Sequence, residues 1–365
     1  MNITAEITGI KYKVIYGAEL AEVDFNNLDI NTSKTYFLLS YNKSNYGVSK
    51  WKSPKRSRSY PFERVYNTFN TAKKITVIPI IKDEGLRGDR DFIQWDTVSL
   101  MSLLDIYVIF AYYHKAAVHN SRDNKISKQE FDNNYVKNKI DEINNYKSSA
   151  LHWNLKEIKD TLPAIIDLVQ TSYSKISGDL SIKMHSDKGI AKFKKQFENG
   201  VADFMSTSRD KAKKAQSREM VTIQPKEHLT TATKATITIK NYLGGEYYLT
   251  TDEILIDLDK LYLIEGKHTK ELIFPSKGDI KDGLLKMVLY TNLINVKINN
   301  VEYIAKPVLK LTSINIIGCI TSHSSEVAIT KFIKMNKLKE NIIDRIDNVF
   351  KEAKENNFEV RIEGV

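Results

Sequence analysis

The chain has 365 residues, of which 42% are hydrophobic and 27% charged, so it can build a substantial core and is not disordered as a whole. Lysine and arginine exceed aspartate and glutamate by 55 to 45, and the formal charge of +10 suits a polyanionic partner such as nucleic acid. The single cysteine, Cys319, excludes an internal disulfide and every zinc motif that needs several cysteines, and it fits a reducing, cytoplasmic location. Neither a secretory signal nor a membrane-spanning segment is expected, because the most apolar run, 106–113, is too short to cross a bilayer.

The first part of the chain has the pattern of an α/β region. Residues 1–72 carry short alternating stretches separated by Asn, Asp and Ser, which indicates β-structure. The continuous apolar runs 74–81 and 106–112 are typical of strands buried on both faces. Between them, 95–104 has the length and composition of a crossover helix, so we expect these two strands to be parallel. Residues 1–120 are therefore assigned to an N-terminal α/β region.

From about residue 126 the hydrophobic period becomes helical, and Pro163 is expected to break or kink the second helix. The segment 121–186 is assigned to a helical region. Candidate helices lie near 126–145, 154–175 and 187–217.

Strands return after residue 220, so 187–320 is expected to be an α/β core and 321–365 a C-terminal helix and strand. The expected strands are 234–240, 252–258, 261–268, 301–305, 313–320 and 358–362. The expected helices are 279–293 and 337–355.

The most informative segment is the pair of apolar strands around Asp259-Lys260, for which a tight hairpin with that two-residue turn is the simplest interpretation. In this register Asp252 lies opposite Lys267. Because side chains alternate between faces, Asp252, Glu265 and Lys267 share one face at the open end of the hairpin. Asp257 points to the other face. A slip of two residues preserves these faces, whereas a slip of one residue exchanges them.

This arrangement has a chemical use. Two carboxylates can hold Mg²⁺ while leaving room for water and a phosphate oxygen. The metal polarises a phosphodiester and lowers the pKa of a bound water. A neighbouring lysine can orient that water and neutralise charge that develops on the phosphate. The Gly266 carbonyl is a further candidate ligand.

The segment resembles the PD-(D/E)xK nuclease superfamily, and type II restriction endonucleases in particular. The matching residues are Asp252, then Glu265-Gly266-Lys267 on the next strand, then the helix that carries 281–287. Two positions depart from the pattern, since Thr251 stands in place of the proline and Gly266 stands where an apolar residue is commoner.

The resemblance implies a PD-(D/E)xK-like core with a mixed central sheet flanked by helices, and Mg²⁺-dependent cleavage of double-stranded DNA at a short sequence. Asp252 and Glu265, with Gly266, would bind the metal, and Lys267 would position the water. A palindromic site would imply a homodimer. A companion DNA methyltransferase would protect the host's own sites.

A basic stretch at 50–60 interleaves cations with aromatic residues and is compatible with either a phosphate-contacting segment or a solvated loop. Two other functions remain open: a repair or structure-selective nuclease with the same core, and a DNA-binding protein without activity. The chain has no P-loop, so an ATP-driven motor is not expected. The candidate DNA-contacting residues are Lys50, Lys52, Lys55, Arg56, Arg58 and His268.

Overall fold

The computed structural model describes residues 1–55, 61–197, 203–207, 210, 214, 233–241 and 246–365. The chain forms two compact units. One, called here the C-terminal unit, comprises Met1–Ala18 and Ala212–Val365, and the other, the middle unit, comprises Glu19–Lys211. These units cut across the ranges expected from the sequence, because the first 18 residues join the end of the chain, and 121–186 belongs with most of 1–120.

The C-terminal unit is built on a mixed nine-stranded sheet in the order β15-β14-β1-β11-β12-β13-β16-β18-β17. The pairs β1–β11, β13–β16 and β16–β18 are parallel, and the other neighbours are antiparallel. The predicted mixed central sheet is therefore confirmed. Its strands are β1 (Asn2–Ile7), β11 (Thr233–Asn241), β12 (Glu246–Asp257), β13 (Lys260–Thr269), β14 (Ile294–Ile298), β15 (Val301–Glu302), β16 (Ile304–Ser313), β17 (Cys319–Thr321) and β18 (Glu359–Gly364).

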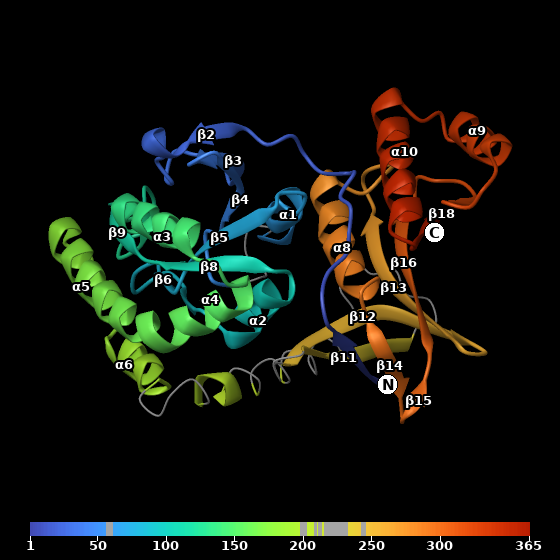
Figure 1. Cartoon of the computed structure of the whole chain (residues 1–365). Helices are drawn as coiled ribbons and strands as arrows, with labels where there is room; N and C mark the ends of the chain where they lie inside the picture. The colour runs from blue at the N-terminus through green and yellow to red at the C-terminus, as the bar shows by residue number, and fades with distance from the viewer. Residues whose placement is uncertain (56–60, 198–202, 208–209, 211–213, 215–232, 242–245) are drawn as a thin grey trace. The chain divides into compact units, whose positions relative to one another are not determined.

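Three helices belong to this sheet: α8 (Lys277–Tyr290), α9 (Glu326–Met335) and α10 (Glu340–Glu355). Figure 1 shows α8 and α10 over one face of the sheet. The helices expected at 279–293 and 337–355 correspond to α8 and α10, whereas the sequence pattern gave no indication of α9.

The N-terminal segment is held in the C-terminal unit by the buried carboxylate of Glu352 on α10. This carboxylate accepts hydrogen bonds from the Tyr12 hydroxyl at 2.8 Å and from the backbone N–H groups of Ile15 at 2.8 Å and Tyr16 at 2.6 Å. Burial, followed by the charge of Glu352, raises the pKa of Tyr12, so the phenol stays protonated and remains a donor. One side chain therefore satisfies three donors of a segment that otherwise lacks secondary structure.

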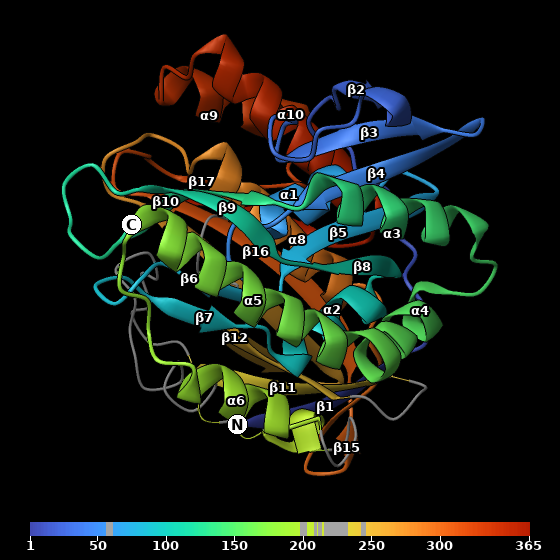
Figure 2. The same cartoon turned by 90° about the vertical axis from the view of Figure 1, so that its left-hand side faces the viewer.

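The middle unit contains a five-stranded sheet in the order β2-β3-β4-β5-β8 and two small two-stranded sheets. Figure 2 shows α3 and α5 over the face of the five-stranded sheet that is turned to the viewer. The strands of the middle unit are β2 (Glu22–Asp24), β3 (Tyr36–Tyr41), β4 (Ser44–Lys50), β5 (Lys73–Pro79), β6 (Ile81–Asp83), β7 (Arg90–Phe92), β8 (Ile106–Ala111), β9 (Tyr113–Val118) and β10 (Ile126–Phe131). Its helices include α1 (Pro61–Asn67), α2 (Trp95–Leu103), α3 (Asn133–Asn145), α4 (Ala150–Lys156), α5 (Leu162–Leu180) and α6 (Lys188–Lys195), with short helical turns at Phe25–Asn27 and Glu157–Thr161.

The predicted crossover in this unit is confirmed. Strands β5 and β8 pair in parallel, and α2 lies between them in the chain. Every residue of β8 is buried, as the continuous apolar run indicated.

The predicted helix at 126–145 is wrong over its first turn and a half. Residues 126–131 form β10, in which Ile126 and Phe131 are buried and the residues between them are more exposed. Asp132 then begins α3, because its side chain accepts a hydrogen bond from the N–H of Tyr135 at 3.0 Å. A good N-cap residue marked the true start of the helix.

The helix expected at 154–175 is divided into α4, a π-helical turn at Glu157–Thr161, and α5. Pro163 stands in the first turn of α5, where its missing N–H interrupts the regular ladder of hydrogen bonds. The irregular turn, Glu157–Thr161, ends just before the predicted position of the break or kink. The helix expected at 187–217 begins as α6, and much of the remainder lies outside the described residues.

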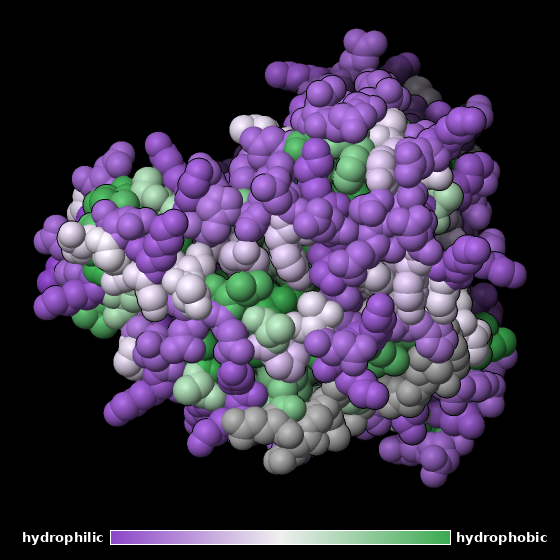
Figure 3. Space-filling view, turned by 60° about the vertical axis from the view of Figure 1, so that its left-hand side comes forward, coloured by the Kyte–Doolittle hydropathy of each residue, from purple (hydrophilic) through white to green (hydrophobic). Residues whose placement is uncertain are grey.

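Hydrophilic side chains cover most of the molecular face drawn in Figure 3. Within the described part of the chain, no helix is both long enough and apolar enough to cross a membrane.

We predict that Glu352→Ala lowers the free energy of unfolding by about 2–4 kcal/mol, because three donors lose their buried acceptor. Glu355→Ala is the matched control, since Glu355 is half exposed and pairs with the exposed Lys13. This control is expected to change stability by less than about 0.5 kcal/mol. Urea denaturation of both variants measures the difference, and equal losses would contradict the anchoring role of Glu352.

Candidate active site

The register of the β12–β13 hairpin differs from the predicted one by two residues. Asp257 pairs with Lys260 and Glu253 pairs with Ile264, so the turn is Leu258-Asp259 rather than Asp259-Lys260. Leu258 provides the left-handed turn conformation with a φ of 54°. The position opposite Asp252 is therefore Glu265 and not Lys267. A two-residue difference preserves the faces of the paired residues, so Glu265 and Lys267 stay on the face opposite to Asp257. Asp252 lies beyond the last pair, beside a β-bulge of β12 against β11.

Asp252 lies at the open end of the hairpin, just beyond the last residue pair, Glu253 with Ile264. It is 6% exposed, and its Oδ2 accepts a hydrogen bond of 2.8 Å from the N–H of Gly266. The N–H and C=O of one strand residue point toward the same edge, so the Gly266 carbonyl also faces β12. A Cβ at Gly266 would lie 3.7 Å from Asp252 Oδ2, which is ordinary contact, so space alone does not require glycine here.

Glu265 is almost completely buried, with 1% of its surface exposed, and each of its oxygens contacts an ammonium group. Its Oε1 lies 3.0 Å from Lys267 Nζ, and its Oε2 lies 2.7 Å from Lys286 Nζ. Burial, followed by the charge of Asp252, raises the pKa of Glu265, while the two lysines act in the opposite direction.

Lys267 is held between two carboxylates. In addition to Glu265, it contacts Asp282 Oδ2 at 2.7 Å. Burial acts to lower the pKa of Lys267, but the charges of Glu265 and Asp282 outweigh it, so this pKa lies above its usual range. Lys267 is therefore a fixed cation of the site and does not serve as a base at neutral pH.

The helix α8 contributes two of the five charged groups at the site, Asp282 and Lys286. Asp282, Lys286 and Tyr290 follow one another at intervals of four residues and so lie along one side of the helix. The Lys286 ammonium and the Tyr290 hydroxyl both reach the carbonyl of Thr250, at 3.3 and 3.4 Å. This stripe connects α8 to the strand that carries Asp252.

Gly283 allows α8 to approach the sheet closely. A Cβ at this position would lie 2.7 Å from Leu309 Cδ1 and 3.3 Å from Lys267 Cε, so a larger side chain would press the helix away from the sheet. The glycine is thus explained by packing rather than by backbone conformation, since it lies within the regular helix.

The side chains present fit a magnesium ion. The donors are the carboxylates of Asp252 and Glu265 and the carbonyl of Gly266, and Mg²⁺ prefers oxygen ligands and needs only one or two carboxylates from the protein. A cluster of three or more acidic, histidine or cysteine side chains suited to a metal is absent from the described residues. Any metal here would accordingly complete its coordination with water and substrate oxygens.

The residues predicted to contact DNA differ in their burial and in their partners. Lys50 is 8% exposed, and its ammonium binds the carbonyls of Ile30 and Asn31, the latter at 3.1 Å, so it is a structural residue. Burial is the main cause that lowers the pKa of Lys50 to about 8. Its assignment as a phosphate contact is wrong for the folded chain.

Lys52 is exposed, as a phosphate contact requires, whereas Lys55 forms an ion pair of 2.6 Å with Asp91. Arg56 and Arg58 lie outside the described residues. His268 is buried, 6% exposed, and its Nδ1 lies 2.9 Å from Thr312 Oγ1. It is not a surface contact, because strand alternation directs it to the face opposite Lys267.

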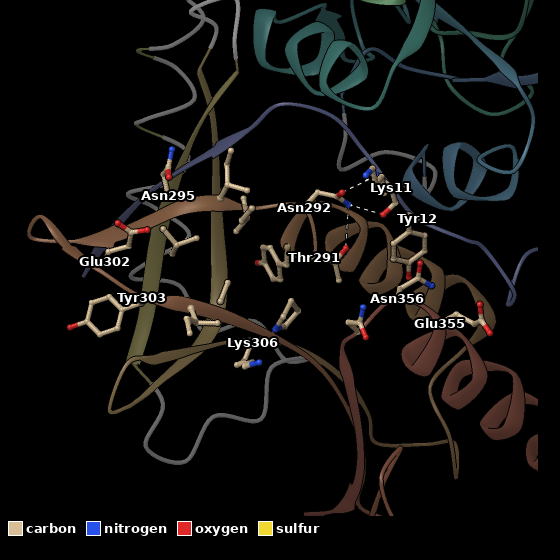
Figure 4. Close-up of a pocket in the computed structure, with 18 of the residues that line it drawn as sticks. Lys11, Tyr12, Thr291, Asn292, Asn295, Glu302, Tyr303, Lys306, Glu355 and Asn356 are labelled. Atoms are coloured by element: carbon tan, nitrogen blue, oxygen red, sulfur yellow. Dashed lines mark hydrogen bonds between the residues drawn. The ribbon is translucent and has the colours of Figure 1, made fainter.

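A groove of about 940 Å³ lies in the same unit, beside the C-terminal end of α8 (Figure 4). Asn292 holds the N-terminal segment at its edge, since its side chain accepts from the N–H of Lys11 at 2.8 Å and donates to the Lys11 carbonyl at 3.2 Å. Pro307, which lines the groove, pairs with Leu263 and therefore shares the sheet face of Glu265. Tyr290 lines the groove as well, and its hydroxyl reaches the Thr250 carbonyl at 3.4 Å.

Sequence reasoning missed Asp282 and Lys286. One sequence signal for them was their interval of four residues within a helix that is otherwise rich in apolar side chains.

Comparison of the chain with family models, curated proteins and solved structures gives no match.

We predict that Asp252→Asn weakens Mn²⁺ binding, measured by electron paramagnetic resonance of the free ion, by at least about tenfold, because one carboxylate ligand is lost. Asp257→Asn is the matched control, since Asp257 is exposed beside the turn and points to the other face. Its affinity for Mn²⁺ should equal that of the unmodified protein. Loss of binding in Asp257→Asn alone would move the metal site to the opposite face.

Proposed function

We propose that the chain is a PD-(D/E)xK-type endonuclease that hydrolyses phosphodiester bonds of double-stranded DNA in the presence of Mg²⁺. The observation that supports this most directly is that Asp252 accepts a hydrogen bond from the N–H of Gly266, while Glu265 and Lys267 on either side of Gly266 form an ion pair. As in the PD-(D/E)xK pattern, a helix follows the hairpin. Its Asp282 contacts Lys267, and its Lys286 contacts Glu265 and the carbonyl of Thr250. The net charge of +10 suits a polyanionic substrate.

In this mechanism Mg²⁺, when bound, polarises the phosphodiester and lowers the pKa of a water molecule. Asp252 and Glu265 would hold the ion, and the Gly266 carbonyl would be a third oxygen ligand. Water attacks phosphorus and releases one proton to solvent, the bond from phosphorus to the leaving oxygen breaks, and that oxygen takes up one proton from solvent. Lys267 orients the water and offsets the negative charge that develops on the phosphate. Asp282 is a positioning residue, because its 2.7 Å contact restricts the Lys267 ammonium.

The proposal extends to a type II restriction endonuclease that cuts at a short sequence. Two-fold symmetric DNA would then be matched by a homodimer, and a companion methyltransferase would protect the host. A repair nuclease with the same site would cut without sequence preference, and a DNA-binding protein without activity would not cut at all.

Digestion of unmethylated DNA of known sequence tests these possibilities. With Mg²⁺ we expect discrete fragments whose ends share one short sequence. Asp252→Asn should abolish cleavage and leave DNA affinity within a few-fold, whereas Asp257→Asn should retain most activity. Ca²⁺ should support binding and only poor cleavage, because its larger and looser coordination positions the reacting groups less well. A smear would favour a repair nuclease, and intact DNA under all conditions would refute the enzyme.

A second test separates buried from exposed lysines in the segment that precedes Arg56. If Lys52 contacts a phosphate, Lys52→Gln should flatten the dependence of log K on log salt by about 0.9. Lys50→Gln should leave that slope unchanged and lower the melting temperature instead, because Lys50 is buried against backbone carbonyls. Fluorescence anisotropy over a salt series gives the slopes. An unchanged slope for Lys52→Gln would assign this loop to solvent.

A further inference from the structure

Lys286 has no counterpart in the strand motif, yet it contacts the centre of the site. Its ammonium lies 2.7 Å from Glu265 Oε2 and 3.3 Å from the Thr250 carbonyl. Its side chain is 18% exposed, so the contact is shielded from solvent more than a surface ion pair is. Lys267 occupies the other oxygen of Glu265. Both oxygens of the carboxylate that would bind the metal are therefore in contact with lysine.

The charges at the site show what this second lysine does. Three carboxylates and two ammonium groups contact one another there, directly or through Gly266, which leaves a formal charge of −1. A divalent cation changes this charge to +1, and a phosphodiester then brings the total to zero. Without Lys286 the protein groups alone would carry −2, which favours the cation more strongly but leaves the complex with DNA negatively charged.

We propose that Lys286 is a positioning residue that compensates the charge of Glu265 before the metal binds, and that it opposes metal binding until an anionic phosphate is present. This inference rests on the proposed function. Lys286 holds the buried Glu265 carboxylate in place through their 2.7 Å contact. It repels a cation on the same carboxylate, and the negative phosphate relieves that repulsion. Metal and DNA should therefore bind cooperatively.

The test is metal affinity measured without DNA and without turnover. Isothermal titration with Mg²⁺ should give about tenfold tighter binding for Lys286→Gln than for the unmodified protein, because one positive charge beside the ion is removed. The glutamine amide can still donate to Glu265, so the packing is largely kept. Lys286→Arg retains the charge and should bind Mg²⁺ like the unmodified protein.

The second readout is the coupling between the two ligands. In the unmodified protein an uncleavable DNA duplex should tighten Mg²⁺ binding several-fold, and Lys286→Gln should reduce this effect while also cleaving more slowly. Lys277→Gln is the matched control, because Lys277 is an exposed residue of the same helix and its loss changes the net charge equally. Its Mg²⁺ affinity and its coupling should not change.

The outcomes are distinct. If Lys286→Gln folds and binds Mg²⁺ no more tightly than the unmodified protein, the inference is overturned while the proposed function stands. If the unmodified protein binds no Mg²⁺ and cuts no DNA, the proposed function itself fails. Lys286→Met provides a second neutral variant. If circular dichroism shows that neither neutral variant folds, Lys286 is a structural residue and the inference is again overturned.

Discussion

The carboxylate of Glu265, buried between two ammonium groups, is the interaction on which the rest of the site depends. A buried charge is tolerated only when opposite charges and hydrogen bonds replace the water that it loses. Strand β13 supplies one of these charges through Lys267, and the second comes from α8, 21 residues later in the chain. The helix must therefore lie against this face of the sheet at short range, and Gly283 removes the side chain that would prevent it.

The topology of the C-terminal unit meets this requirement. Strand β16 runs parallel to β13, so the chain must return between them, and α8, β14 and β15 lie in that connection. The same crossover places Leu309 of β16 beneath Gly283. The fold thus brings a hairpin motif and a helix stripe together by one connection, and the packing of that helix also fixes the geometry of its charged groups.

The sequence specified the sheet face more reliably than the register. The turn lies one residue earlier than predicted, at Leu258-Asp259, yet Glu265 and Lys267 remain on the face opposite to Asp257 because pairings that differ by two residues are equivalent in parity. The parallel β5–β8 pair was predictable for a similar reason, since buried runs on either side of a helix have few other arrangements. The place of β1 between β14 and β11 was not predictable, because its alternating pattern says only that one face is buried.

Burial of charged side chains is what local sequence describes least well. Lys50 in a basic stretch has the same sequence signature whether it contacts phosphate or, as here, backbone carbonyls in the interior. For α8, however, the sequence contained a usable signal. Apolar residues at 280, 284, 285, 287, 288 and 289 cover more than one side of the helix, which indicates that it is buried nearly all round. Charged residues within such a helix cannot all be solvated, so Asp282 and Lys286 had to find partners inside the fold. The preceding strand carries the charged residues Glu265 and Lys267. Lys286 indeed pairs with Glu265.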